Sequence, residues 1–158
     1  MTPYTARPLT PAALKELRTR DDAGRTMAPF TDEEGGAPLR CCLCRSAPGE
    51  RIALVSYAPL RRWAAETRVD PGAYDEQGPV FIHAEECPGP DGTALPFTDA
   101  RRTVRRYSTD GRILGGRLVE DGADFEPALT DAFADPEVAL VHVRAVEFGC
   151  FLYEVRRP

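Results

Sequence analysis

The residues of this chain with the clearest chemical potential are its two histidines and five cysteines. His83 and His142 each lie within a short apolar run rich in β-forming residues, and each is followed by a cysteine, Cys87 or Cys150. Imidazole has the side-chain pKa closest to neutral pH, and a thiolate is both a nucleophile and a metal ligand. The sequence therefore indicates a polar site that two histidine-bearing strands could share.

Four of these side chains have the spacing of a zinc site. Cys41-x-x-Cys44 and His83-x-x-x-Cys87 form two pairs close to the patterns of tetrahedral structural zinc. However, we predict a strand over Arg40–Cys44, in which side chains three residues apart point to opposite faces. We therefore expect no metal and no cofactor, and interpret the cysteines as small, partly buried hydrophobic residues. A zinc-stapled structural domain is kept as an alternative.

The predicted C-terminal hairpin argues against a cysteine–histidine nucleophile. If residues 147–149 form a three-residue loop, His142 faces Glu154 across the ladder. Cys150 and His142 then share a face but lie four pairs apart, about 13 Å at the rise of a strand, whereas a dyad needs roughly 3 Å. Cysteine-based catalysis is therefore not expected, and no catalytic residue is assigned.

The same register, which sets Arg144 opposite Leu152, gives the hairpin one apolar face and one polar face. The face expected in the core carries Val141, Val143, Phe151, Tyr153 and Val155. The other face carries His142, Arg144, Glu154 and Arg156. This polar face is either a solvated surface with cross-strand ion pairs or one wall of a ligand pocket.

A pocket would bring this polar face together with the second histidine-bearing strand. Phe81 and His83 share one face of that strand, so His83 is either a hydrogen-bonded core histidine or a ligand contact. The loop carrying Trp63, with Arg61 and Arg62, would complete the pocket. The candidate ligand-binding residues are His83, His142, Arg144 and Glu154, and the expected partner is a small molecule.

The charge distribution disfavours nucleic acid as a partner. The formal net charge is -5, so the long-range field repels phosphate. The densest basic patch consists of Arg101, Arg102, Arg105 and Arg106. Because Asp99 and Asp110 flank this patch, we interpret it as a salt-bridged surface.

The elements expected to position these residues are mostly strands. They are predicted at Arg40–Cys44, Arg51–Tyr57, Pro79–His83, Thr103–Ser108, Arg112–Glu120, Val138–Val146 and Cys150–Arg156. Short turns at 46–50, 109–111 and 147–149 favour antiparallel hairpins. Helices are expected to begin at Thr10-Pro11 and to span Glu126–Ala134. The predicted class is α+β, with a mainly antiparallel β-sheet of about seven strands and two short helices.

Length and composition predict a single domain over residues 1–158, with a helix and a mobile connection in 1–38 and the core in 39–158. Residues 58–78 and 84–97 are interpreted as long loops. The sequence contains no apolar run of 18 residues, so no membrane association is expected. An odd number of cysteines and the lack of a secretion-like N-terminus predict a cytoplasmic protein with reduced thiols.

Several segments in combination resemble a known family. They are Arg40–Leu60, Gly78–Ala84, Arg106-Tyr107 with Asp110–Arg112, and Val141–Arg144 with Gly149–Leu152. From about Pro38 to its end the chain resembles the bacterial family called domain of unknown function 1203, which implies a bacterial protein without an assigned activity. We predict a small-molecule binding domain, or an enzyme of unassigned reaction, with a polar His/Arg pocket. A non-catalytic protein-interaction module is the alternative.

Overall fold

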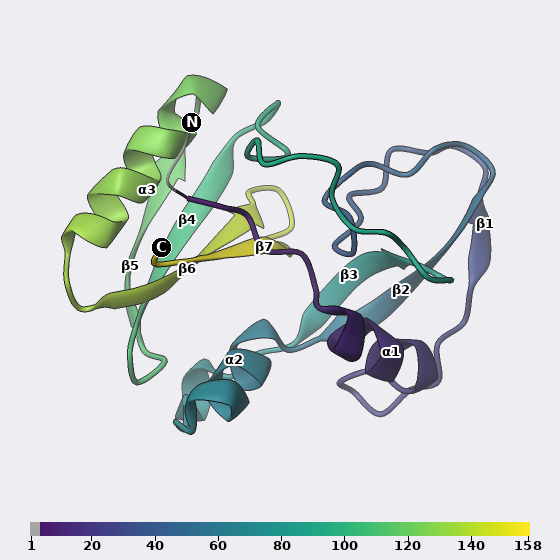
Figure 1. The fold of residues 1–158 in the computed structure, drawn as a ribbon, viewed down its shortest axis with the longest axis horizontal. Helices are drawn as coiled ribbons and strands as arrows, with labels where there is room; N and C mark the ends of the chain where they lie inside the picture. Colours follow the sequence, from purple (N-terminus) through teal and green to yellow (C-terminus); the bar gives the residue numbers. More distant parts are fainter. Residues whose placement is uncertain (1–3) are drawn as a thin grey trace. The chain divides into compact units, whose positions relative to one another are not determined.

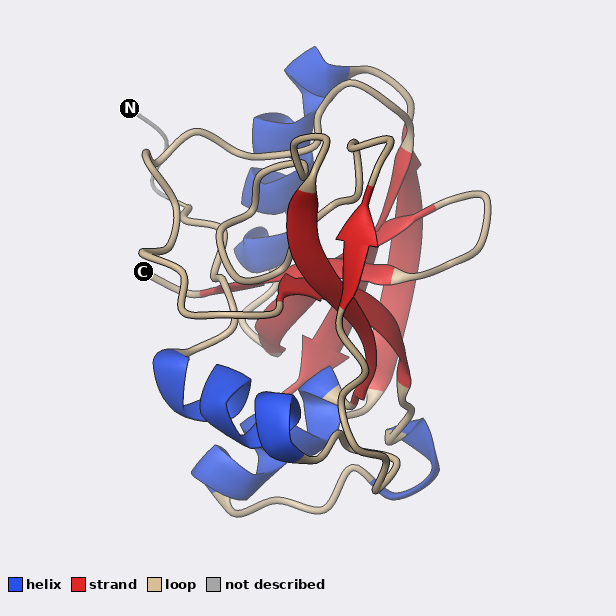
Figure 2. Ribbon diagram, turned by 90° about the vertical axis from the view of Figure 1, so that its right-hand side faces the viewer, coloured by secondary structure: helices blue, strands red, loops and turns tan. Residues whose placement is uncertain are grey.

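The computed structural model describes residues 4–158, which form three α-helices and seven strands arranged in two antiparallel sheets (Figures 1 and 2). The predicted α+β class is confirmed, but the strands divide between two sheets and the helices number three rather than two. Among the described residues, none of the helices is long and apolar enough to cross a membrane.

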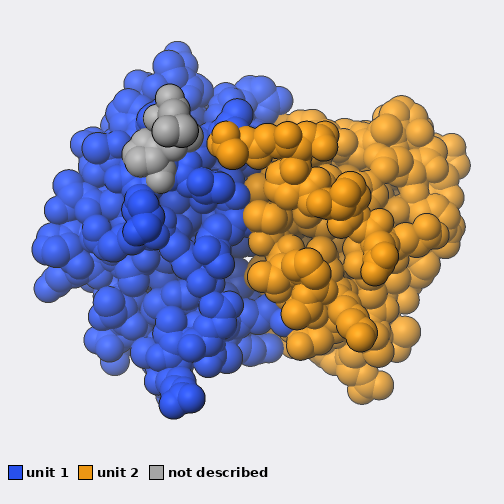
Figure 3. Space-filling model, in the orientation of Figure 1, with its two compact units in different colours: residues 1–7, 58–76, 94–158 blue, residues 8–57, 77–93 orange. Residues whose placement is uncertain are grey.

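The helices are α1 (Pro11–Thr19), α2 (Pro59–Thr67) and α3 (Phe125–Ala134), with 3₁₀ turns η1 (Gly72–Tyr74) and η2 (Gly122–Asp124). The strands are β1 (Phe30–Asp32), β2 (Glu50–Tyr57), β3 (Gly78–His83), β4 (Arg102–Ser108), β5 (Ile113–Val119), β6 (Val138–Ala145) and β7 (Phe151–Arg156). The chain divides into two compact units, coloured in Figure 3. Unit 1 comprises residues 1–7, 58–76 and 94–158, and unit 2 comprises residues 8–57 and 77–93.

Unit 1 is built on the four-stranded sheet β5-β4-β6-β7, in which β6 pairs with both β4 and β7. Helix α3 packs along this sheet (Figure 1) and buries Phe125, Leu129 and Phe133. It ends before Asp135-Pro136, as predicted, because a proline disfavours helical dihedrals in the preceding residue. Helix α2 contributes to a second cluster, in which Leu60, Trp63 and Ala64 pack with Tyr107 and Leu140.

Helix α2 lies where a long loop was predicted. Pro59 stands in the first turn of the helix, where a missing backbone N–H costs no hydrogen bond, and Leu60, Trp63 and Ala64 form an i, i+3, i+4 stripe. The loop interpretation was therefore wrong although the pattern was present. Trp63, which was expected at the rim of a pocket, is a core residue only 5% exposed.

The C-terminal hairpin shows where the predicted register holds and where it fails. His142 pairs with Glu154 and Val143 with Tyr153, as predicted. A bulge then places Arg144 opposite Phe151 instead of Leu152. The bulge transfers Phe151 from the Val143 face to the His142 face, where its ring lies edge-on to the imidazole at a centroid distance of 5.0 Å.

Unit 2 contains the three-stranded sheet β1-β2-β3 and helix α1, whose predicted N-cap Thr10 accepts a hydrogen bond from the Ala13 N–H. Strand β1 lies within the connection predicted to be mobile. The strand predicted over Arg40–Cys44 is wrong. Backbone hydrogen bonds from Leu39 N–H to Cys44 O and from Leu43 N–H to Leu39 O close a turn there instead.

Candidate metal centre

The turn that replaces the predicted strand brings cysteines beside His83. Leu39 forms a parallel bridge with Phe81, and the Arg40 N–H donates to Phe81 O. Two residues further along both segments, Cys41 therefore lies beside His83, whose backbone N–H donates to Cys41 Sγ over 3.3 Å. The register of one short bridge thus fixes the first two members of the cluster.

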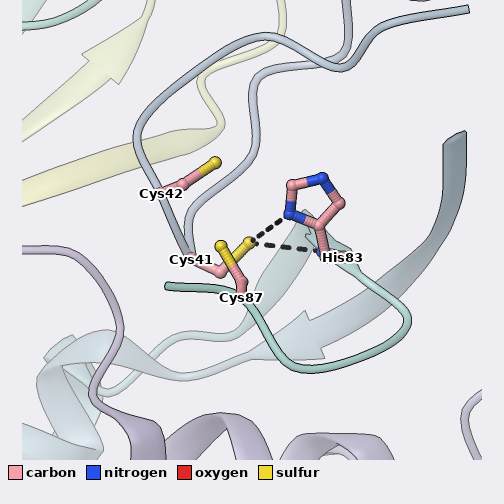
Figure 4. Close-up of side chains that lie close together, drawn as sticks. All are labelled: Cys41, Cys42, His83 and Cys87. Atoms are coloured by element: carbon pink, nitrogen blue, oxygen red, sulfur yellow. Dashed lines mark hydrogen bonds between the residues drawn. The ribbon is translucent and has the colours of Figure 1, made fainter. Parts of the chain in front are cut away.

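A bend after strand β3 supplies the remaining thiol. The chain bends at Ala84 and Glu85 and returns Cys87 to the cluster, while the 39–44 turn also contributes Cys42 (Figure 4). The ligand atoms of Cys41, Cys42, His83 and Cys87 all lie within 4.8 Å of one another. In a tetrahedral zinc site with Zn–S bonds near 2.3 Å, ligand atoms are separated by roughly 3.8 Å, so small side-chain movements suffice.

The imidazole of His83 is held between a thiol and a carboxylate. Its Nε2 lies 2.6 Å from Glu50 Oε2, and its Nδ1 lies 3.3 Å from Cys41 Sγ. Glu50 begins β2 and occupies the same face as Ile52, which pairs with His83. A carboxylate that accepts the Nε2–H leaves the Nδ1 lone pair directed at the cluster. Metal-binding histidines commonly donate their other ring N–H to a carboxylate in this way.

The three thiols differ in how readily they ionise. A hydrogen bond from Cys42, together with the His83 backbone N–H, lowers the pKa of Cys41 despite burial. The same bond to Cys41 and burial raise the pKa of Cys42. Burial also raises the pKa of Cys87. Cys41 is therefore the thiol of the cluster that ionises most readily, and the thiolate is the form that binds metals and attacks electrophiles.

The cluster differs by one member from the zinc set considered in the sequence. Cys44 was paired with Cys41 there, but its thiol is exposed and donates to Cys42 O at 3.4 Å, whereas Cys42 joins the cluster. The reason for rejecting zinc, opposite faces of a strand, does not apply because residues 41–44 form a turn. The expected absence of metal remains a prediction.

Comparison with known families covers the part of the chain that carries this cluster. Residues 36–157 match the family described as "Protein of unknown function (DUF1203)". The chain belongs to this family. Neither curated proteins nor solved structures gave a significant match. All four clustered side chains of this DUF1203 chain lie within the matched residues.

The same contacts could also serve a nucleophilic cysteine. Cys41 would be the nucleophile, His83 its base, and Glu50 the group that orients the base. The dyad rejected from the sequence was Cys150–His142, which is a different pair of residues. Cys41 is, however, only 2% exposed, so a substrate could not reach its sulfur without rearrangement. Two further thiols beside it favour metal ligation over nucleophilic catalysis.

The other predicted site residues of the DUF1203 chain lie in unit 1. His142 and Glu154 pair directly, with Nε2 and Oε1 2.9 Å apart, and the imidazole is fully buried. Arg144 does not bind Glu154, but forms an ion pair with Glu76 at 3.0 Å. His83 lies in unit 2, so the predicted site shared by both histidines remains a prediction.

Three residues that the sequence analysis did not single out now matter. Cys42 and Glu50 complete the surroundings of His83, and Glu76 bridges Arg144 and Arg105. Two members of the basic patch are ion-paired, as expected: Arg105 with Glu76, and Arg102 with the flanking Asp99 at 3.7 Å. Arg102 is also buried and donates to Phe97 O. The adjacent pair Cys41-Cys42 was a usable signal, since neighbouring side chains can converge in a turn but not in a strand.

Proposed function

We propose that this chain is a zinc-binding domain in which Cys41, Cys42, His83 and Cys87 hold one Zn²⁺ ion. The observation that supports the proposal is the convergence of three thiols and one imidazole within 4.8 Å. Thiolate and imidazole donors suit Zn²⁺, whereas Mg²⁺ and Ca²⁺ require oxygen ligands. The hydrogen bond between His83 Nε2 and Glu50 is of the kind that orients histidine ligands in such sites.

Four protein donors favour a structural role for the ion. Catalytic zinc sites keep one coordination position open for water or substrate, whereas structural sites are filled by protein ligands. The donors come from the 39–44 turn, the end of β3 and the bend that follows it. A zinc ion would cross-link these three segments and stabilise unit 2.

The proposal is tested by elemental analysis of the full chain purified without added metal. We expect about one equivalent of zinc in the wild type, with loss of most of it in Cys41→Ser and Cys87→Ser. Replacement of zinc by Co²⁺ should give the absorption bands of a tetrahedral thiolate site, which report the ligand set directly.

The chain contains its own matched controls. Cys44 and Cys150 are also free cysteines, but both lie outside the cluster, so Cys44→Ser and Cys150→Ser should retain zinc. Cys44 belongs to the zinc ligands considered in the sequence but not to the observed cluster. Retention of zinc in Cys44→Ser would therefore favour the observed cluster as the ligand set. A wild type that neither contains zinc nor takes up Co²⁺ as a thiolate complex would refute the proposal.

A further inference from the structure

Two arginines in unit 1 converge on a single carboxylate. Arg105 Nη1 lies 2.7 Å and Arg144 Nη1 lies 3.0 Å from Glu76 Oε1. In the β4–β6 ladder, Arg105 pairs with His142 and Thr103 with Arg144, so both arginines project from the same face of neighbouring strands. The sheet register itself therefore brings two positive charges together.

We propose that Arg105 and Arg144 form a binding site for a small carboxylate ligand, and that the carboxylate of Glu76 occupies this site in the structure. The sequence predicted a small-molecule ligand without a chemical class, and this proposal assigns that ligand to the carboxylates. Of the predicted ligand-binding residues, the proposed site includes Arg144. All its members lie in unit 1, whereas the proposed zinc ligands lie in unit 2. The two proposals can therefore fail independently.

The arginine pair is held in place by groups other than Glu76. Arg144 Nε donates to Gly149 O over 2.8 Å, and Arg105 Nη1 lies 3.3 Å from Tyr107 Oη. Arg144 has a side chain only 13% exposed, and burial together with the nearby Arg105 charge lowers its pKa. Donors that are already ordered lose little conformational freedom when a ligand binds.

The arrangement is poorly explained by stability alone. Two guanidinium groups and one carboxylate leave one uncompensated positive charge, and apolar residues can often replace partly buried ion pairs without loss of stability. Arginine is the side chain best suited to carboxylate recognition, because its planar fork donates two parallel hydrogen bonds. Glu76 engages both arginines through one oxygen, so a ligand oxyanion could make additional hydrogen bonds.

Glu76 is suited to being displaced. Its side chain is 47% exposed and lies in the irregular segment after η1. Ion pairs with this exposure contribute about 0–1 kcal/mol, so a ligand carboxylate could compete with it. Arg156 on β7 is engaged differently, because it pairs with both Glu154 and Glu66.

The test measures binding of malonate and of inorganic phosphate by calorimetry at fixed ionic strength. Glu76→Gln removes the internal competitor, so it should bind malonate about fivefold more tightly than the wild type. Adding Arg144→Lys or Arg105→Lys to Glu76→Gln keeps the charge but removes the fork, and either should weaken malonate binding at least about tenfold. Melting temperatures show which of these two variants is folded and usable.

Asp131→Asn is the matched control, because it removes one carboxylate from an exposed ion pair with Arg117 elsewhere in unit 1. It should leave malonate affinity unchanged. The proposal is overturned if Glu76→Gln does not bind malonate, if Asp131→Asn strengthens binding equally, or if the lysine variants bind normally. Tighter binding of phosphate than of malonate would contradict the carboxylate class.

Discussion

His142 Nε2 lies 2.9 Å from Glu154 Oε1 across the β6–β7 ladder, and the two side chains are only 1% and 10% exposed. Burial lowers the pKa of His142 against the opposing effect of Glu154, so the imidazole is held neutral and donates its Nε2–H. Burial alone would raise the pKa of Glu154, but the hydrogen bonds from His142 and Arg156 lower it below its usual value. The pair is therefore a carboxylate beside a neutral imidazole.

This pair predicts that stability is lost on acidification. Both native pKa values are lowered, so the unfolded chain takes up protons at higher pH than the native chain. As the pH is lowered past about 6.5, His142 of the unfolded chain takes up a proton and the free energy of unfolding should decrease. It should decrease further at about pH 4, where Glu154 of the unfolded chain takes up a proton. Urea unfolding between pH 7 and pH 5 measures the slope, which His142→Gln should flatten. An unchanged slope in this variant would contradict the assignment.

Val143 should tolerate no charge. Its side chain is fully buried on β6 opposite Tyr153, so Val143→Asp would bury an unpaired carboxylate and should abolish soluble expression. Val143→Ala, which removes two methyl groups, should cost about 2 kcal/mol by chemical denaturation. Leu118→Asp on β5 is the control, because Leu118 is 47% exposed and its variant should remain soluble. Equal behaviour of the two aspartate variants would show that the register is wrong.

Two hairpin glycines should differ in their tolerance of alanine. Gly111 and Gly149 both have positive φ, 77° and 73°. A Cβ at Gly111 would lie 3.1 Å from Pro71 Cβ and 3.3 Å from Trp63 Cζ3, whereas one at Gly149 would meet nothing within 4 Å. Gly149→Ala should therefore cost about 1 kcal/mol from backbone strain alone, and Gly111→Ala clearly more. Equal losses in denaturant midpoint would argue against packing of the turn on α2.

Metal removal should destabilise the chain if the cluster holds structural zinc. Zinc binding contributes on the order of 10 kcal/mol in small zinc domains, and a core of this size would retain part of its stability without it. We expect a strong chelator to lower the melting temperature by at least about 6 °C, corresponding to roughly 3 kcal/mol. Added zinc should restore it. Cys87→Ser should melt at the lower temperature with or without chelator, whereas Cys150→Ser should respond as the wild type does.

The sequence by itself determined the strands whose pattern repeats locally. Six predicted strands occur within two residues of their expected ends, and the 109–111 and 147–149 turns close the expected hairpins. Turn residues and alternating side chains specify these features over a few positions. The pairing of His142 with Glu154 follows from the same local counting, because the loop length fixes the ladder until the bulge interrupts it.

Tertiary structure alone decided which polar side chains meet. The Cys41–His83 contact depends on a parallel bridge between Leu39 and Phe81, which lie 42 positions apart, and no spacing rule encodes such a bridge. The meeting of Arg105 with Arg144 likewise depends on the β4–β6 register. Local periodicity specifies elements because their hydrogen bonds and burial repeat over neighbouring residues. Long-range contacts are instead selected by how apolar faces pack, and that is a property of the whole fold.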